Sequence, residues 1–573
     1  MTSLLHILIT LIIVFICAKP LGEYMARIYA GKKVWLHPIL GWVENGIYRL
    51  CDIDPKEEMH WFRYYVTVVM LGMVGFVFLY LILLFQDHLP LNPNQYVGFS
   101  PDLAFNTAMS FVTHTSWQGY SGETQLSILS QMLGVVVQNF MSAAAGMAVA
   151  VALFRGFKRK NMHTIGNAWA DMIRTIIYVL LPLSFVFALF LVSQGVVQNF
   201  TGQILYQPLQ VHAELNEHAI AHGPVASQLS AKLLSSNGGG YFNVNSAHPY
   251  ANPTPLTNML SATAMLLLPV AFIYCFGIMA GDRRQGWSLL TAMTIIFLPL
   301  AFAAMSIEQG PNPKFDPAVI DQSAGNMEGK EMRIGAMDSA LWGVVATATS
   351  SGTVNSMHDS YMPLSGMIML MLIQFGEVIY GGVGNGAVEM IVYVLITVFL
   401  GGLMVGRTPE YLGKKLGPYE MKMAGLVMIM PSALVLFGTA LTIMLQLGHL
   451  TAHNPGAQGF TEILYAFSST SRNNGSAFSG LDTNTPYYNI ALGICMAIGK
   501  FWVFAPVLAI AGSLAAKQSL PVSSGTLPTH TPLFTLMLVG VVILMDVLTY
   551  VPSLALGPIA EHLTLYASEV VLP

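Results

Sequence analysis

The chain has 573 residues, of which 54% are apolar and 9% are charged, and its mean hydropathy is +0.59. A soluble domain carries about 25% charged residues, so this composition excludes a soluble protein and indicates one that lies in a lipid bilayer. The net charge of −4, without a basic run, gives no indication of a nucleic-acid partner, and four scattered cysteines imply neither a disulfide framework nor a metal cluster.

Ten apolar segments are long enough to cross a bilayer, given roughly 20 residues per crossing. They lie at about 3–19, 64–86, 127–153, 172–194, 256–280, 288–306, 365–405, 422–448, 487–513 and 532–556. The seventh is too long for one straight helix, and we expect it to break at the glycine-rich run 381–386. The predicted fold class is an all-α polytopic membrane protein with ten transmembrane helices.

Lysine and arginine are unevenly divided between the two sides of this topology. The loop at residues 19–63 holds seven of them, whereas the loop at residues 87–126 holds none. Over the whole chain nineteen lie on one side, five lie on the other, and Lys500 lies inside the ninth segment. Because cytoplasmic loops carry the excess of basic residues, this asymmetry predicts that both termini lie outside the cytoplasm.

Four external hairpins lie between spanning segments, and each begins with about ten weakly amphipathic residues. Ser116, Gly238, Gly352 and Gly475, in the cores of these hairpins, are separated by 122, 114 and 123 residues. This near-constant period indicates an internal fourfold repeat of helix, pore loop and helix around one axis. We expect a first helix with its cytoplasmic loop at 1–63, pore repeats at 64–153, 172–280, 288–405 and 422–516, and a last helix with an external tail at 532–573.

The hairpin cores favour a selectivity filter for a monovalent cation. One such core taken alone could be a flexible turn, but irregular backbone at membrane depth is tolerated only when it is buried in protein or lines water. Carbonyls of small residues can replace water around a dehydrated ion, and without a carboxylate they suit K⁺ better than Mg²⁺. The predicted filter residues are Thr113, His114, Thr115, Ser116, Ser236, Asn237, Gly238, Gly239, Ser350, Ser351, Gly352, Asn473, Asn474 and Gly475.

Two features near the predicted filter are candidates for the ion path. The first is the run with Gly381, Gly382 and Gly384, which is either a gate or a packing kink. The second is Lys500, which lies in mid-span, where insertion of a charge costs roughly 2.5–3.5 kcal/mol. Lys500 either tunes the ion path or partner interface, or makes a structural pair with Asp546 of the last segment.

Several other polar residues have weaker functional predictions. Glu377 and Glu389 flank the broken helix and either shape the field of a cavity below the filter or lie in solvent. Gln118 and Glu123 follow the first hairpin core and are expected to form hydrogen bonds that support the filter mouth. The pair His358–Asp359 has no nucleophile at a recognisable spacing, so we expect it to order an external loop.

No catalytic ATPase site is predicted in this chain. The run Gly493–Phe501 is a poor match to a phosphate-binding loop because its spacing is one residue too long and Phe501 replaces the Ser or Thr. The Asp-Lys-Thr-Gly phosphorylation signature of P-type ATPases does not occur. Energy for active transport would therefore come from a partner.

Six long strings carry a family resemblance. They are Asn237–Pro249, Val354–Ser360, Gly376–Gly384, Gly406–Lys415, Asn473–Phe478 and Ser524–His530. With these strings the chain closely resembles, nearly end to end, the potassium-binding A subunits of Kdp potassium-transporting ATPases. The resemblance implies a channel-like subunit of the superfamily that contains the Trk, Ktr and HKT potassium transporters.

The resemblance also implies the ligands, partners and location of the chain. Potassium would be the transported substrate, held by backbone carbonyls of the filter, while ATP and Mg²⁺ would bind to a partner. The implied partners are a P-type ATPase B subunit, a small C subunit and a single-helix F subunit, assembled in the bacterial cytoplasmic (inner) membrane among its lipids. The run 381–386 matches the family's inner loop, which limits direct passage to the cytoplasm.

The chain departs from the family pattern at three positions. The family commonly has Asn where this chain has His114, Asn or Asp where it has Ser116, and Arg where it has Lys500. Because filters bind ions mainly through the backbone, we expect the same ion, whereas Lys500 loses the planar guanidinium. Two alternative functions stay open: an autonomous Trk/Ktr-like transporter driven by the membrane potential, and a membrane assembly protein with a non-conducting pore.

Overall fold

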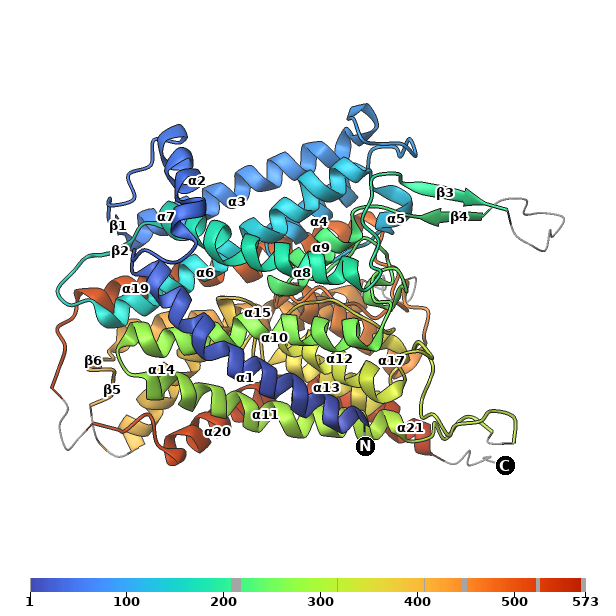
Figure 1. The fold of residues 1–573 in the computed structure, drawn as a ribbon. Helices are drawn as coiled ribbons and strands as arrows, with labels where there is room; N and C mark the ends of the chain where they lie inside the picture. Colours follow the sequence, from blue (N-terminus) through green and yellow to red (C-terminus); the bar gives the residue numbers. More distant parts are fainter. Residues whose placement is uncertain are drawn as a thin grey trace.

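The computed structural model describes residues 2–207, 218–316, 318–404, 406, 408–445, 451–521 and 526–567. Arg407 and Ser524, within two of the strings above, and the predicted external tail beyond residue 567 lie outside the described residues. Within the described residues, ten helices are long and apolar enough to cross a membrane, which confirms the predicted fold class (Figure 1).

The ten spans include π-helical turns as well as α-helices. They are α1 (Thr2–Tyr29); α3 (Trp61–Leu84); α6 (Val137–Lys158) after a π-helical turn at Ser130–Val136; α7 (Ala168–Arg174) and α8 (Leu181–Ser193), joined by Thr175–Leu180; α10 (Pro255–Ala280); α11 (Arg283–Gln309); α14 (Asn385–Met404); α15 (Pro418–Met444); α18 (Pro486–Ala497) and α19 (Val503–Ala516), joined by Ile498–Trp502; and α20 (Pro532–Leu554) with Ala555–Ile559 and α21 (Ala560–Tyr566). Helices α6, α10 and α14 are buried along most of their length, so they form the centre of the bundle.

Three spans begin at the same local signal, a threonine followed by proline. The side chains of Thr254, Thr485 and Thr531 accept hydrogen bonds from backbone N–H groups three residues later, at the starts of α10, α18 and α20. The following proline is in the first turn, where its missing N–H is not needed. The sequence therefore encodes these helix starts locally.

Four short helices lie between spanning helices and do not cross the bundle. They are α4 (Pro101–Val112), α9 (Val225–Leu234), α12 (Ala336–Ala348) and α17 (Gly456–Ser471). Figure 1 shows all four in the half of the molecule nearer the ribbon of β3 (Gln203–Tyr206) and β4 (His218–Ala221). The start of α1 and the short helix α21 lie at this same end.

The seventh predicted segment is two helices in the structure. Helix α13 (Pro363–Gln374) ends and α14 begins after ten irregular residues, 375–384. The backbone of Gly376, Tyr380 and Gly384 is left-handed in this segment, with φ of 78°, 54° and 93°. A left-handed backbone cannot continue an α-helix, so the interruption is built into these residues.

The first helix is longer than predicted. It passes through Pro20 and reaches Tyr29, ten residues beyond the predicted end at residue 19. Met25 and Tyr29 are buried after the proline, and a Cβ on Gly22 would lie 2.7 Å from the Ala271 carbonyl oxygen of α10. Tertiary packing against α10 thus extends a helix whose apolar run is interrupted by Lys19 and Pro20.

The remaining elements lie in the loops. They are α2 (His37–Leu50), α5 (Gly122–Gln125), the 3₁₀ turns Gln86–His88, Asn245–Ala247 and His358–Ser360, and two antiparallel ribbons, β1 (Met59–His60) with β2 (Thr164–Gly166) and β5 (Glu410–Tyr411) with β6 (Lys414–Lys415). Helix α2 and these two ribbons lie at the end opposite to β3 and β4 (Figure 1). This second end carries the basic loops.

Candidate functional site

Each short helix ends in a loop with the same backbone reversal. The residue after the last helical position and its cap is left-handed in all four loops: His114 (φ 69°), Ser236 (52°), Ser350 (53°) and Asn473 (52°). Residues other than glycine adopt this conformation at a cost, and such strain concentrates at functional sites. The repetition at equivalent positions shows that the four loops share one geometry.

Three glycines let neighbouring loops approach each other closely. A Cβ on Gly238, Gly352 or Gly475 would overlap, respectively, the carbonyl oxygen of Ser351, Asn474 or Thr115. Each of these carbonyls belongs to the next loop in the order second, third, fourth and first. The absence of a side chain at these positions is therefore a requirement of the close contact.

Side-chain hydrogen bonds also join neighbouring loops, and one at each of the four boundaries closes the ring. These four run from Ser116 Oγ to Asn237 Oδ1, from Ser351 Oγ to the Asn237 carbonyl (2.9 Å), from Ser350 Oγ to the Arg472 carbonyl (3.2 Å) and from Asn473 Nδ2 to Thr115 Oγ1 (2.8 Å). Together with the glycine contacts they link the first loop to the second, the second to the third, the third to the fourth and the fourth to the first. The four loops form a closed ring, which we call the loop ring.

The predicted filter residues all lie in the loop ring or at its junction with the short helices. All are buried except Gly475, which is half-buried. A cavity of about 940 Å³ opens on one side of the ring, and residues of all four loops, among them Ser116, Gly239, Gly352 and Gly475, line it. The ring is therefore accessible from the end that carries β3 and β4.

His114 and Ser116, the two residues of the first loop that differ from the pattern of the family that the chain resembles, contact the same side chain, that of Asn237. Ser116 Oγ donates to Asn237 Oδ1, and Asn237 Nδ2 lies 3.2 Å from His114 Nδ1. Because an amide nitrogen only donates, His114 Nδ1 accepts this bond. His114 and Ser116 thus satisfy both ends of the Asn237 amide across the boundary between the first two loops.

The residues that were predicted to support the filter mouth or to order an external loop form hydrogen bonds. Gln118 Nε2 donates to the Gly240 carbonyl (3.1 Å), Glu123 Oε2 accepts from the Asn243 N–H (2.9 Å), His358 Nδ1 lies 3.0 Å from the Tyr465 hydroxyl, and Asp359 Oδ2 accepts from the Gly480 N–H (2.7 Å). Gln118 and Glu123 connect the first hairpin to the second. His358 and Asp359 order an external loop against the fourth hairpin.

Lys232 is a site residue that was not predicted from the sequence. It lies in the last turn of α9 and is buried, and its Nζ donates to the Gly239 carbonyl (2.6 Å) and to Asn245 Oδ1 (3.0 Å). Its position follows Val225 and Leu229 at helical spacing, which places it on the apolar face of α9. A lysine on the apolar face of a short pore helix is the signal that could have revealed it.

Replacement of Lys232 by methionine is expected to destabilise the second loop. The Gly239 carbonyl and the Asn245 amide lose a charged donor in a buried setting, which costs about 1–3 kcal/mol. The thermal unfolding midpoint of the purified chain should fall. The control is Lys314→Met, because Lys314 is exposed in an external loop; equal behaviour of both variants would contradict a supporting role for Lys232.

The irregular segment 375–384 packs closely beneath the third loop. A Cβ on Gly382 would lie 3.6 Å from the Thr349 carbonyl oxygen, at the end of α12. A Cβ on Gly384 would approach the backbone of Gly146 in α6, and one on Gly381 would overlap the Glu377 carbonyl. The glycines thus allow this segment to lie against the end of a short helix on one side and against α6 on the other.

The counter-ion predicted for Lys500 is wrong. Lys500 lies in the π-helical turn between α18 and α19, and its Nζ is 4.0 Å from Glu377 Oε1. Asp546 instead accepts a hydrogen bond from the Tyr393 hydroxyl at 2.7 Å. The pairing depends on the break before α14, which brings Glu377 into the bundle, and hydropathy alone does not show this.

Both glutamates beside the break are buried, so the solvent-exposed alternative for them is wrong. Glu389 Oε2 accepts from the Glu377 N–H (3.0 Å) and lies 3.7 Å from Arg472 Nη1. Arg472 directly follows α17 and precedes the fourth loop. Two cations and two carboxylates therefore form a buried charge cluster next to the loop ring.

Lys500 borders two small cavities in this region. One, of about 20 Å³, is also lined by Gln138 and Ser142, and the other, of about 10 Å³, by Glu377 and Asn473. A water molecule needs about 10–15 Å³ of such space and polar partners, so each cavity has room for about one water. Lys500 Nζ has no hydrogen-bond partner among the described residues, and Lys500 lines both cavities.

Comparisons with known proteins agree on one family. The family model described as the potassium-transporting ATPase A subunit matches residues 8–563. The potassium-transporting ATPase potassium-binding subunit of Methylococcus capsulatus is 51% identical over 96% of this chain and 97% of that protein, and that of Herpetosiphon aurantiacus is 52% identical over 98% and 99%.

A solved structure extends the comparison to the fold. The potassium transporter TrkH from Vibrio parahaemolyticus superposes with a TM-score of 0.50 over 86% of this chain and 96% of that one, at 14% identity. At this identity the likeness concerns the fold alone. The family model matches nearly the whole length, and about half of the residues are identical to those of curated members. The chain therefore belongs to the potassium-transporting ATPase A subunit family.

Proposed function

We propose that this chain binds external K⁺ in a filter of backbone carbonyls and passes it toward a P-type ATPase partner in an ATP-driven potassium uptake pump. The closed loop ring is the observation that carries this proposal. It joins four equivalent loops, has a wide cavity on one side, and has a buried charge cluster with small cavities close to it. The potassium-binding subunits among the relatives support K⁺ as the ion.

The chemistry of the loop ring suits a weakly hydrated cation. Its predicted filter residues are Thr, Ser, Asn, Gly and one His, so carbonyl and hydroxyl oxygens rather than carboxylates face any ion held there. The four short helices end at the ring, and each brings about half a negative charge from its dipole. Carbonyl dipoles replace the water shell of K⁺ readily, whereas Mg²⁺ dehydrates reluctantly.

Below the filter, we assign control of the path to the segment 375–384 and to Lys500. The segment fills the space beneath the third loop, with Gly381, Gly382 and Gly384 at its tightest contacts, and so blocks a straight exit. Lys500 with Glu377 then sets the field that an ion meets after the filter. The proposed route leads sideways to the partner subunit, which binds ATP and Mg²⁺.

The uneven distribution of basic residues supports the orientation. The basic loops lie at the end with α2, β1, β2, β5 and β6. We place this end on the cytoplasmic side of a bacterial inner membrane, with both termini on the outer side. The B, C and F subunits of a Kdp complex are the proposed partners. We retain 64–153, 172–280, 288–405 and 422–516 as the bounds of the four pore repeats.

ATP-dependent uptake tests this function directly. The chain co-expressed with its partner subunits is expected to co-purify with a P-type ATPase and to accumulate ⁸⁶Rb⁺ in proteoliposomes only when Mg-ATP is present. The chain reconstituted alone should accumulate none under a membrane potential set by valinomycin. Uptake by the isolated chain would support the autonomous Trk-like function, which the 14% identity to TrkH against about 50% to A subunits does not favour.

A further inference from the structure

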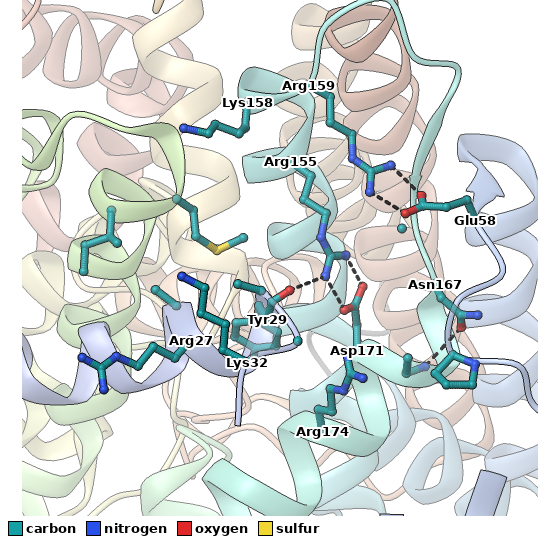
Figure 2. Close-up of a pocket in the computed structure, with 18 of the residues that line it drawn as sticks. Arg27, Tyr29, Lys32, Glu58, Arg155, Lys158, Arg159, Asn167, Asp171 and Arg174 are labelled. Carbon is teal, nitrogen blue, oxygen red and sulfur yellow. Dashed lines mark hydrogen bonds and ion pairs between the residues drawn. The ribbon is translucent and has the colours of Figure 1, made fainter. Parts of the chain in front are cut away.

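A cavity of about 690 Å³ lies at the basic end of the molecule, far along the helices from the loop ring. It opens between α1, α6, α7 and the start of α11, and seven cationic side chains against four carboxylates line it (Figure 2). Its volume is within the range of about 300–1,000 Å³ that holds small molecules. The ion path described above does not use it.

The carboxylates of this basic pocket are already paired. Asp171 binds Arg155 (2.5 Å), Glu58 binds Arg159 (2.6 Å), Glu23 lies 3.3 Å from Arg283, and Glu57 pairs with Arg63 outside the pocket. Arg27, Lys32 and Lys158 have no described carboxylate within 4 Å, although they line the same pocket. The pocket therefore has about three unneutralised positive charges.

Figure 2 shows how these charges are arranged. Arg155 and Asp171 face each other in the middle of the view, and Lys32 and Lys158 lie on one side of this pair without a drawn interaction. Arg155 is held further by its hydrogen bond to the Tyr29 carbonyl (3.1 Å). A rigid guanidinium–carboxylate pair thus forms one wall, and two free ammonium groups lie beside it.

Helix α2, which contacts the pocket wall, carries an exposed apolar face. Trp35 just before it and Ile39 and Trp42 within it lie on one face and are 73%, 62% and 75% exposed, whereas Glu44 on the other face is buried. Arg174 of the pocket wall donates from Nε to Glu44 (2.9 Å), and the Trp35 ring lies 6.2 Å from that of Tyr24. An apolar face rich in tryptophan is typical of a helix lying in the membrane interface.

We propose that the basic pocket binds the phosphate-bearing headgroup of an anionic phospholipid, with Lys32 and Lys158 as its main cationic contacts. Basic pockets between helices on the cytoplasmic side suit such headgroups. The exposed apolar face of α2, a helix that is joined to the pocket wall through the Arg174–Glu44 contact, suits the acyl chains of the same lipid. A soluble anion would make no contact with this apolar face. The inference rests on the orientation given under the proposed function.

The test measures lipid binding to the assembled complex in detergent by native mass spectrometry, with phosphatidylglycerol and phosphatidylcholine as probes. In Lys32→Ala/Lys158→Ala the dissociation constant for phosphatidylglycerol is expected to rise about 30-fold, roughly fivefold per lysine. The matched control is Lys56→Ala/Lys160→Ala, two exposed lysines of the neighbouring loops that do not line the pocket. The control and phosphatidylcholine binding should be unchanged.

Several outcomes would overturn the proposal. Equal losses in both double variants would indicate general surface charge, and displacement of the lipid by inorganic phosphate would indicate a soluble anion site. Binding to the isolated chain but not to the complex would show that an acidic partner segment covers the pocket. If the alanine variant fails to fold, Lys32→Arg/Lys158→Arg should still bind phosphatidylglycerol like the unmodified protein, and loss of binding there would count against the site.

Lipid binding and potassium transport are tested by separate measurements. The binding titration contains no K⁺ or ATP, so failure of ATP-dependent Rb⁺ uptake would overturn the proposed function without changing the lipid result. Conversely, normal uptake combined with unselective lipid binding would overturn only the pocket assignment.

Discussion

Replacement of Gly238 by alanine is expected to weaken K⁺ and Rb⁺ binding by about 10- to 100-fold without loss of expression. The new Cβ would overlap the Ser351 carbonyl oxygen and lie 3.1 Å from the Gly352 Cα. Because the loop ring is closed, the second loop cannot move away from the third without displacing the first. Overpacking of this kind costs about 1–3 kcal/mol, and each 1.4 kcal/mol is a factor of ten in affinity.

The measurement is competition of K⁺ against Rb⁺ for the purified complex, together with uptake at limiting K⁺. Gly540→Ala in α20 is the matched control, because no atom lies within 4 Å of its added Cβ. A displaced carbonyl should also relax the discrimination between K⁺ and Rb⁺. Normal affinity and normal uptake in Gly238→Ala would argue against a filter at this loop.

Replacement of Lys500 by methionine is expected to abolish most transport while the loop ring still binds K⁺. The substitution leaves the carboxylate of Glu377 buried without its cation, and loss of one partner of a buried pair costs about 3–5 kcal/mol. The double variant Lys500→Met/Glu377→Gln removes both charges. It should recover most of the lost stability but not transport, since the field beneath the filter is still absent.

Thermal unfolding, Rb⁺ binding and ATP-dependent uptake of the single and double variants separate these effects. Asp546→Asn is the control, because Asp546 contacts Tyr393 and not Lys500. Because Asp546 and Lys500 are not in direct contact, the effect of Asp546→Asn on stability should be close to additive with that of Lys500→Met. Strong coupling between Lys500 and Asp546, or full transport by Lys500→Met, would contradict the assignment.

Much of the candidate site could be predicted from the sequence because the four loops repeat. The spacing of Ser116, Gly238, Gly352 and Gly475 predicts four equivalent hairpins, and the structure places these residues in one ring. Small residues were the right signal there, since only a backbone without a side chain allows contact with the next loop's carbonyl. Lys232 was not predicted as a site residue because it was considered only as one of the basic residues that indicate the orientation in the membrane.

Properties that depend on neighbours along the chain could be predicted without the structure. Spans follow from apolar length, helix starts from pairs such as Thr254–Pro255, and the break before α14 from a run of glycines. Which buried charges meet depends instead on how the helices pack. Glu377 and Lys500 are 123 residues apart, and a buried ion takes whichever partner the packing brings near, which no local pattern encodes.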